Sequence, residues 1–261
     1  MLNLSSRLRV QTGDNVGIGG FIVRGNAPKK VIVRGLGPSL NVNGSPVSGR
    51  LGDPMLELHD GSGATIVTND NWRSSQEQEI KDSGLAPNDD REAAILLTLP
   101  AGSYTAIIKG VDDTSGVGLV EIYDLESTNA DDLANLSTRA NVLTDDDVLI
   151  GGVIVRGGNT SRIMFRAIGP SMKVDNIPVA GRMEDPTLAL HDGNGALMTS
   201  NDNWKNAPNA AEIQSSGLAP SDDRESAILT TISPGNYTAI VRGLDRTTGI
   251  GLVEAFSIGN P

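Results

Sequence analysis

Oxygen-bearing side chains gather in two acidic stretches, and each stretch occurs twice. Asn69-Asp70-Asn71-Trp72 returns as Asn201-Asp202-Asn203-Trp204, and a Gly-Leu-Ala-Pro-x-Asp-Asp-Arg-Glu segment spans 84–92 and 217–225. Calcium takes about six to eight oxygen ligands from carboxylates, amides and backbone carbonyls. The candidate calcium ligands are therefore Asp60, Asn69, Asp70, Asn71, Asp89, Asp90 and Glu92 in the first copy, and Asp192, Asn201, Asp202, Asn203, Asp222, Asp223 and Glu225 in the second.

The same acidic residues also have a purely structural interpretation. Asp and Asn side chains often cap turns, because they accept hydrogen bonds from the backbone of their own loop. The sequence has neither an EF-hand spacing nor a nonapeptide calcium repeat that would favour the metal. Both interpretations stay open, and calcium binding is the one that makes a direct prediction about stability.

Trp72 and Trp204, the two tryptophans of the chain, close the repeated Asn-Asp-Asn-Trp stretch. Each indole ring could be a stacking platform for a sugar, as in a carbohydrate-binding module. Alternatively, each ring could plug the core, with its N–H bonded to a nearby carbonyl. We favour the plug, because no second aromatic residue adjoins either tryptophan, and we keep sugar binding as the alternative.

Four arginines stand near the acidic stretches and could be taken for substrate clamps. They are Arg34 and Arg91 with their equivalents Arg166 and Arg224. A guanidinium group carries five donors, so it can bind a carboxylate and loop carbonyls together. We expect such structural pairing, with carboxylates such as Asp53, Asp90 or Glu92 as partners.

His59 and His191 are the only histidines. Zinc normally needs more nitrogen or sulfur ligands than one histidine per repeat supplies. A Ser-His-Asp triad with Ser39 is conceivable, but no Gly-x-Ser-x-Gly motif is present, and paired carboxylates of a glycoside hydrolase remain open. Duplication of the whole set argues against an active site, so we expect no enzyme and keep a hydrolase as the alternative.

These residues belong to an internal repeat. Leu4-Ser5-Ser6-Arg7 aligns with Leu136-Ser137-Thr138-Arg139, and the second copy has one extra residue between Trp204 and Ile213. We predict two domains, residues 1–126 and 127–261, joined by a polar linker at 126–135. Each domain is long enough to bury its own core.

Within each repeat, short apolar runs alternate with turn residues, which is typical of antiparallel strands. The first repeat should have strands near 16–24, 30–34, 55–59, 64–68, 93–99, 103–109 and 118–125, with turns at Gly37-Pro38-Ser39 and at 60–63. Ser74-Ser75-Gln76-Glu77 predicts a capping box for a short helix. The pattern indicates an all-β protein made of two tandem antiparallel β-sandwich domains, jelly-roll-like in arrangement.

The composition limits the partners of the chain. Its formal net charge is −11, which argues against nucleic acid and against anionic membrane surfaces. Cysteine is absent, which excludes disulfides and cysteine-ligated zinc. No apolar run approaches the about 20 residues of a membrane helix, so we expect no membrane insertion. The N-terminus lacks a signal peptide, which would fit a fragment or mature form of a longer exported protein.

Three short motifs carry a family resemblance: Leu56-Glu57-Leu58-His59-Asp60, then Asn69-Asp70-Asn71, then residues 99–104 with the sequence Leu-Pro-Ala-Gly-Ser-Tyr. Their second copies lie at 188–192, 201–203 and 233–237. The motifs resemble the bacterial pre-peptidase C-terminal (PPC) type of β-sandwich over slightly more than half of each repeat. The resemblance implies an exported, non-catalytic and sometimes calcium-binding accessory module.

Together, these features predict a non-catalytic module of a bacterial secreted or cell-surface protein, with a structural or adhesive role and with calcium as the candidate cofactor. The expected partners are other protein domains or further copies of the chain at the cell surface. The alternative is a carbohydrate-binding accessory module of a secreted hydrolase, with glycans as partners.

Overall fold

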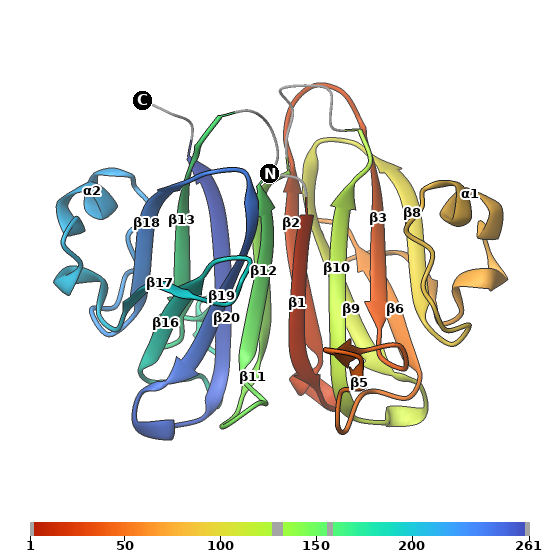
Figure 1. Cartoon of the computed structure of the whole chain (residues 1–261), viewed down its shortest axis with the longest axis horizontal. Coiled ribbons are helices and arrows are strands. Elements are labelled where there is room, and N and C mark those ends of the chain that lie inside the picture. The colour runs from red at the N-terminus through yellow and green to blue at the C-terminus, as the bar shows by residue number, and fades with distance from the viewer. Residues whose placement is uncertain (1–2, 127–132, 156–158, 259–261) are drawn as a thin grey trace. The chain divides into compact units, whose positions relative to one another are not determined.

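The computed structural model describes residues 3–126, 133–155 and 159–258. These residues form an all-β protein of antiparallel strands with few short helices, of which α1 (Glu77–Asp82) and α2 (Ala210–Ser215) are α-helical (Figure 1). In the described ranges no helix is long and apolar enough to cross a membrane. The chain divides into two compact units, residues 2–136 and 137–261. The predicted linker at 126–135 overlaps residues 127–132, which lie outside the described residues.

The first unit contains two groups of four antiparallel strands. One group has the order β1–β10–β3–β8 and the other has the order β2–β9–β6–β7. A small hairpin, β4–β5, follows the Gly-Pro-Ser turn. The bounds are β1 Asn3–Val10, β2 Gly17–Val23, β3 Lys29–Leu36, β4 Asn41–Val42, β5 Ser45–Pro46, β6 Pro54–His59, β7 Thr65–Asn69, β8 Ala93–Leu99, β9 Gly102–Gly110 and β10 Gly116–Asp124.

The second unit has the same order of elements. Strand β11 pairs with β20, and β20–β13–β18 continue that group; the other group is β12–β19–β16–β17. The hairpin β14–β15 corresponds to β4–β5. The bounds are β11 Leu133–Val142, β12 Leu149–Val155, β13 Ser161–Ile168, β14 Lys173–Val174, β15 Ile177–Pro178, β16 Pro186–His191, β17 Leu197–Asn201, β18 Ser226–Ile232, β19 Gly235–Gly243 and β20 Gly249–Ile258.

The core of the first unit lies between its two strand groups. Successive side chains of a strand point to opposite faces, so β3 presents one set of residues to each side. Gly35 of β3 faces the second group, since a Cβ atom there would come within 2.9 Å of the Leu56 side chain. Ile32 and Arg34 therefore point to the other face of the same strand. Trp72 and Ile80, from the chain between β7 and β8, pack against Ile32 on that outer face.

Candidate functional site

In both units a long segment connects the edge strand of one strand group to the edge strand of the other, β7 to β8 or β17 to β18. The segment packs on the outer face of the group that contains β8 or β18. We call residues 70–92, between β7 and β8, the first excursion, and residues 202–225, between β17 and β18, the second excursion. Each carries a short helix, α1 or α2, which Figure 1 shows beside β8 or β18. The excursions contain most of the predicted calcium ligands and both tryptophans.

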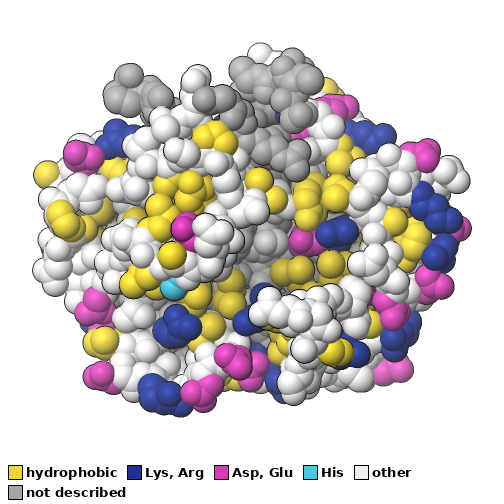
Figure 2. Space-filling view, in the orientation of Figure 1, with side chains coloured by type: hydrophobic (Ala, Val, Ile, Leu, Met, Phe, Trp, Pro, Cys, Tyr) yellow, Lys and Arg dark blue, Asp and Glu magenta, His cyan; other side chains and the backbone are white. Residues whose placement is uncertain are grey.

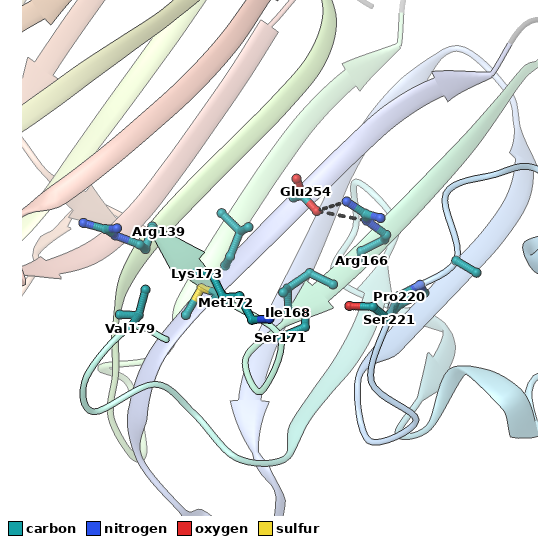
Figure 3. A pocket seen from close by; sticks show the side chains of 12 residues that line it. Arg139, Arg166, Ile168, Ser171, Met172, Lys173, Val179, Pro220, Ser221 and Glu254 are labelled. Atoms are coloured by element: carbon teal, nitrogen blue, oxygen red, sulfur yellow. Dashed lines mark hydrogen bonds and ion pairs between the residues drawn. The ribbon is translucent and has the colours of Figure 1, made fainter. Parts of the chain in front are cut away.

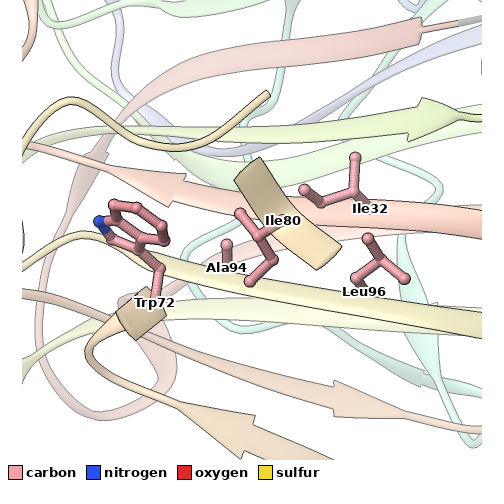
Figure 4. Close-up of a cluster of buried hydrophobic side chains, with 5 residues drawn as sticks. All are labelled: Ile32, Trp72, Ile80, Ala94 and Leu96. Atoms are coloured by element: carbon pink, nitrogen blue, oxygen red, sulfur yellow. The ribbon is translucent and has the colours of Figure 1, made fainter. Parts of the chain in front are cut away.

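Trp72 anchors the first excursion to the outer face of β3 and β8. It is 2% exposed and packs with Ile32, Ile80, Ala94 and Leu96 in one apolar cluster (Figure 4). Its indole N–H donates to the Asp89 carbonyl at 3.1 Å. Arg73 covers the ring, with its guanidinium carbon 4.4 Å from the ring centroid. This geometry is that of the core plug expected from the sequence, and it leaves little of the ring for a sugar.

Trp204 has the same packing but a different polar environment. It is 4% exposed and packs with Met164, Ile213, Ala227 and Leu229. Among the described atoms its indole nitrogen has no hydrogen-bond partner. The predicted indole bond is therefore present in the first unit and missing in the second.

Glu92 is, together with Glu225, the most completely buried of the predicted calcium ligands. Its side chain is shielded from solvent, and Oε1 accepts hydrogen bonds from the backbone N–H groups of Gly37 at 3.0 Å and Ser39 at 2.9 Å. The Ser39 hydroxyl donates to the same oxygen at 2.7 Å. Oε2 accepts from the Asp89 N–H at 3.3 Å. The carboxylate thus pins the excursion to the Gly-Pro-Ser turn.

Glu225 repeats this arrangement in the second unit. It is buried and accepts from the N–H groups of Gly169 at 3.1 Å and Ser171 at 2.9 Å, and from the Ser171 hydroxyl at 2.7 Å. Because Ser39 and Ser171 both donate to a glutamate, their hydroxyls are engaged away from any histidine. His59 and His191 instead contact the carbonyls of Gly63 and Gly195 in their own hairpins.

The arginines pair with carboxylates, as the sequence predicts, but the partners differ from those expected. Arg34 binds Glu121 on the neighbouring strand β10 and donates to the Leu85 carbonyl at 2.8 Å. Arg91 binds Asp89 through two hydrogen bonds, at 2.9 and 2.8 Å. The expected partners Asp53, Asp90 and Glu92 were proposed from nearness in sequence, whereas strand register places Arg34 opposite Glu121.

Arg166 and Arg224 repeat the pattern with Glu254 and Asp222. The guanidinium group beside each aspartate holds the pKa of Asp89 and of Asp222 below its ordinary range. Both carboxylates are therefore charged at neutral pH and already bound to a cation.

Asn69 and Gln76 bind the outer edge of strand β8 through their side-chain amides. Asn69 Oδ1 accepts from the Ala94 N–H at 3.0 Å, and Gln76 Nε2 donates to the Leu96 carbonyl at 2.8 Å. Asn201 and Asn209 contact Ala227 and Leu229 of β18 in the same way, at 3.0 and 2.9 Å. Two of the predicted calcium ligands, Asn69 and Asn201, thus satisfy the backbone of an edge strand.

The capping box predicted at Ser74-Ser75-Gln76-Glu77 is wrong. Helix α1 begins at Glu77, and the residue before it, Gln76, has a left-handed backbone (φ 57°) and makes no side-chain capping bond. Its amide is occupied by strand β8. Long-range pairing with the edge strand takes precedence over the local cap.

Asp60 and Asp192 lie in the β6–β7 and β16–β17 hairpins, away from the excursions. Asp60 Oδ1 accepts from the N–H groups of Ser62 at 2.8 Å and Ala64 at 3.1 Å, and Asp192 accepts equivalent bonds at 2.9 Å. Strand β6 separates Asp60 from Asp53, and six residues of strand extend about 20 Å. The structure therefore does not bring Asp60 together with the other candidates.

Asp70 and Asp89 lie near a residue that the prediction of ligands missed, Asp53. Burial, and next the charge of Asp70, raise the pKa of Asp53; Asp112 and Asp89 add to this effect and Arg91 opposes it. Asp53 Oδ1 is buried without a hydrogen-bond partner. Asp70 is exposed, and Asp90 pairs with Arg73 at the surface. We call Asp53, Asp70, Asp89 and Asp112 the first aspartate cluster.

The second unit has the matching cluster of Asp185, Asp202, Asp222 and Asp245. Burial, and next the charge of Asp202, raise the pKa of Asp185, while Arg224 opposes the shift. Oδ1 of Asp185 and Oδ1 of Asp202 are both buried without a partner. Asp223 pairs with Lys205, and Asn203 donates to Asp202 at 3.0 Å. An Asp-Pro dipeptide present in both copies, at 53–54 and 185–186, is the sequence signal that could have identified Asp53 and Asp185.

No group of three or more His, Cys, Asp or Glu side chains in the described residues is arranged to hold a metal ion. A cation at either cluster would need one or more carboxylates to reorient, and amide, carbonyl or water oxygens to complete its shell. Repulsion among the aspartates supplies the electrostatic reason for such a cation to bind.

Comparisons with known proteins place the chain in no family. No family model matches the sequence, and no characterised protein matches it. Among solved structures, the chain is similar to a DUF4785 family protein from Legionella pneumophila subsp. pneumophila, with 9% identity, a TM-score of 0.26, and coverage of 97% of this chain and 83% of that one.

Proposed function

We propose that the chain is a non-catalytic extracellular module with a structural or adhesive role. In this proposal it consists of two tandem antiparallel β-sandwich domains, jelly-roll-like in arrangement, that derive from one internal repeat. Each sandwich would be formed by the two four-strand groups of a unit. Attachment would be to other protein domains or to further copies of the chain at the cell surface.

One observation supports the structural role. The side chains that the sequence marks as candidate ligands instead attach each excursion to its strand group. Glu92 binds the Gly-Pro-Ser turn, Asn69 binds the β8 edge, and Trp72 fills the space beneath the excursion. The second unit makes the corresponding contacts through Glu225, Asn201 and Trp204. These groups serve folding, which fits a module whose function lies in its shape and stability.

We further propose that each aspartate cluster binds a calcium ion that stabilises its unit. Burial and, next, the like charges around Asp53 raise its pKa, and a divalent cation would relieve the repulsion among these charges. The unpartnered Oδ1 of Asp53, and that of Asp185, would be available as ligands. The sequence predicts Asp70 and Asp90, with Asp202 and Asp223 in the second copy, as the charged centre of the site. Asp90 and Asp223 instead pair with Arg73 and Lys205 at the surface, so the proposal keeps Asp70 and Asp202 only.

Thermal unfolding of metal-stripped protein tests this proposal. Calcium should raise the melting temperature and EDTA should reverse the effect, since a ligand of the folded state at a hundredfold excess over Kd adds about 2.7 kcal/mol. A Kd of about 10⁻⁵–10⁻⁴ M would suffice at extracellular calcium levels. Asp70→Ala combined with Asp202→Ala should abolish the response.

The matched control removes two charges outside the clusters. Asp82 accepts a bond from Gln78 that an asparagine would keep, and Asp175 has a positive φ of 51° that asparagine tolerates. The variant Asp82→Asn with Asp175→Asn should respond to calcium as the parent does. Identical melting curves in calcium and in EDTA would refute the calcium proposal and leave the structural role standing.

A further inference from the structure

A cavity of about 350 Å³ opens on the outer face of the second unit. Strands β11, β13 and β20 form its floor, and the β14 hairpin and the second excursion form its walls. Figure 3 shows Arg139 at one side and Pro220 and Ser221 at the other. Its size falls within the range of small-molecule sites, about 300–1,000 Å³.

The cavity carries an excess of positive charge in an acidic protein. Its lining has three cations, Arg139, Arg166 and Lys173, and one carboxylate, Glu254, whereas the whole chain has a net charge of −11. Arg166 is bound to Glu254. In the described part of the chain no ion pair engages Arg139 or Lys173. The local field therefore favours an anionic ligand.

Glu254 offers one free acceptor inside this positively charged cavity. Both of its bonds to Arg166 use Oε2. In the first unit the equivalent Glu121 has its Oε1 occupied by the Tyr123 hydroxyl at 3.0 Å. The residue equivalent to Tyr123 is Phe256, which has no hydroxyl. Oε1 of Glu254 thus has no donor among the described side chains.

A ligand that fits must combine two kinds of group. It must bring a carboxylate or similar anion to Arg139 and Lys173, and hydroxyl donors to Glu254, because a second carboxylate alone would be repelled there. The floor between them is aliphatic, with Ile168, Met172 and Leu252, and suits the C–H face of a sugar ring.

We propose that this cavity binds a sugar acid, such as one uronic acid residue of an anionic polysaccharide. The first unit differs at the two decisive positions, where Asn41 replaces Lys173 and Tyr123 replaces Phe256. The site is therefore specific to the second unit. It is separate from the aspartate clusters and does not depend on the calcium proposal.

Isothermal titration of the full chain with trigalacturonic acid at low salt tests the proposal. We expect saturable binding, and no measurable binding of neutral trigalactose or of triglutamate. Lys173→Asn and Phe256→Tyr should each weaken binding by about tenfold, since one removes a charged contact and the other occupies Glu254 Oε1. Asn41→Lys is the positional control: it places the cation at the equivalent position of the first unit, where the Tyr123 hydroxyl still occupies Glu121 Oε1, and it should leave the affinity unchanged.

Lys173→Asn and Phe256→Tyr each introduce the residue that the first unit has at the equivalent position, so neither variant should disturb folding. Unchanged melting temperatures should accompany the loss of binding. Backbone amide shifts of Ser171 and Lys173 in the parent chain give a second readout that needs no variant. The proposal would be overturned if trigalacturonic acid did not bind, or if the two variants bound it as tightly as the parent. It would also be overturned if the amide shifts were confined to other residues, or if triglutamate bound as tightly as the sugar acid.

Discussion

A buried carboxylate with four hydrogen-bond donors, as at Glu92, contributes to stability through the groups it satisfies. Burying a charge is costly unless it is hydrogen-bonded, and here the donors come from the Gly-Pro-Ser turn and from Asp89. The sequence shows an acid and a turn but not that they meet, because 55 residues separate Gly37 from Glu92. Glu92 and Glu225 were predicted as calcium ligands because they are acidic. In the structure each instead accepts hydrogen bonds from a Gly-Pro-Ser turn.

We expect Glu92→Gln to lower the free energy of unfolding of the first unit by about 1–3 kcal/mol, because an amide NH₂ group would face backbone donors in place of one oxygen. Urea denaturation measures the change. Glu79→Gln, at an exposed position on α1, is the control and should have little effect. A loss no larger than that of the control would show that the turn does not depend on the carboxylate.

Asp53 gives a pH-dependent prediction. Its pKa is raised in the folded state, chiefly by burial and by Asp70, so the folded protein binds this proton more tightly than the unfolded chain. The associated stability is present below the unfolded pKa of about 3.9 and is lost as the pH rises through the folded pKa. At neutral pH the ionised carboxylate therefore opposes folding of the metal-free protein.

Asp53→Asn should consequently stabilise the EDTA-treated protein at pH 7. The gain should shrink as the pH falls through the raised folded pKa of Asp53 and should be absent below about 4, where the carboxyl is protonated in both states. Urea titrations at several pH values measure both effects. Asp185→Asn should behave in the same way, since Asp202 and burial act on it similarly. A gain that does not vary with pH would show that the ionised carboxylate of Asp53 is not its source.

At the scale of elements, the outer edge of strand β8 shows how the excursion protects the fold. An edge strand exposes unpaired N–H and C=O groups that can recruit another chain. Here Asn69 and Gln76 occupy those groups at Ala94 and Leu96, and Asn201 and Asn209 do so on β18. Side-chain amides thus stand where a neighbouring strand would be.

Asn69→Ala should destabilise the first unit by about 1–3 kcal/mol, since it leaves the buried Ala94 N–H without an acceptor. It should also increase aggregation on heating, because part of the edge becomes free. Light scattering and urea unfolding report the two effects. Asn71→Ala is the matched control, because among the described residues Asn71 accepts hydrogen bonds through its backbone carbonyl, which alanine keeps. Equal behaviour of the two variants would contradict this role for Asn69.

Periodicity predicted the strands well where apolar residues alternate or cluster. The expected strands at 55–59, 93–99 and 103–109 lie within or match β6, β8 and β9. Strand β1 was not predicted, because Asn3–Val10 mixes serine and arginine with its apolar residues. The capping box failed for a related reason: Gln76 is held by a strand twenty residues away, which local patterns cannot reveal.

For the whole molecule, the repeat in the sequence predicts which groups of interacting side chains occur twice. The small differences between the two copies predict where the units differ in function. Acidic and basic side chains are interspersed over the visible face (Figure 2), so net charge alone locates no site. The ion pairs across neighbouring strands are more informative, and they join Arg34 to Glu121 and Arg166 to Glu254. The difference between Tyr123 and Phe256 has meaning only once that register is known.

The last prediction follows from having one aspartate cluster in each unit. If each cluster binds one calcium ion, isothermal titration of the metal-stripped chain should give two ions per chain. Asp70→Ala or Asp202→Ala alone should reduce the stoichiometry to one, because each aspartate raises the pKa of a cluster partner in its own unit, Asp53 or Asp185. The double variant should bind none. Titration in sodium chloride of equal ionic strength should produce no saturable heat, since screening has no stoichiometry. A stoichiometry that stays at two in either single variant would show that calcium binds elsewhere on this acidic chain.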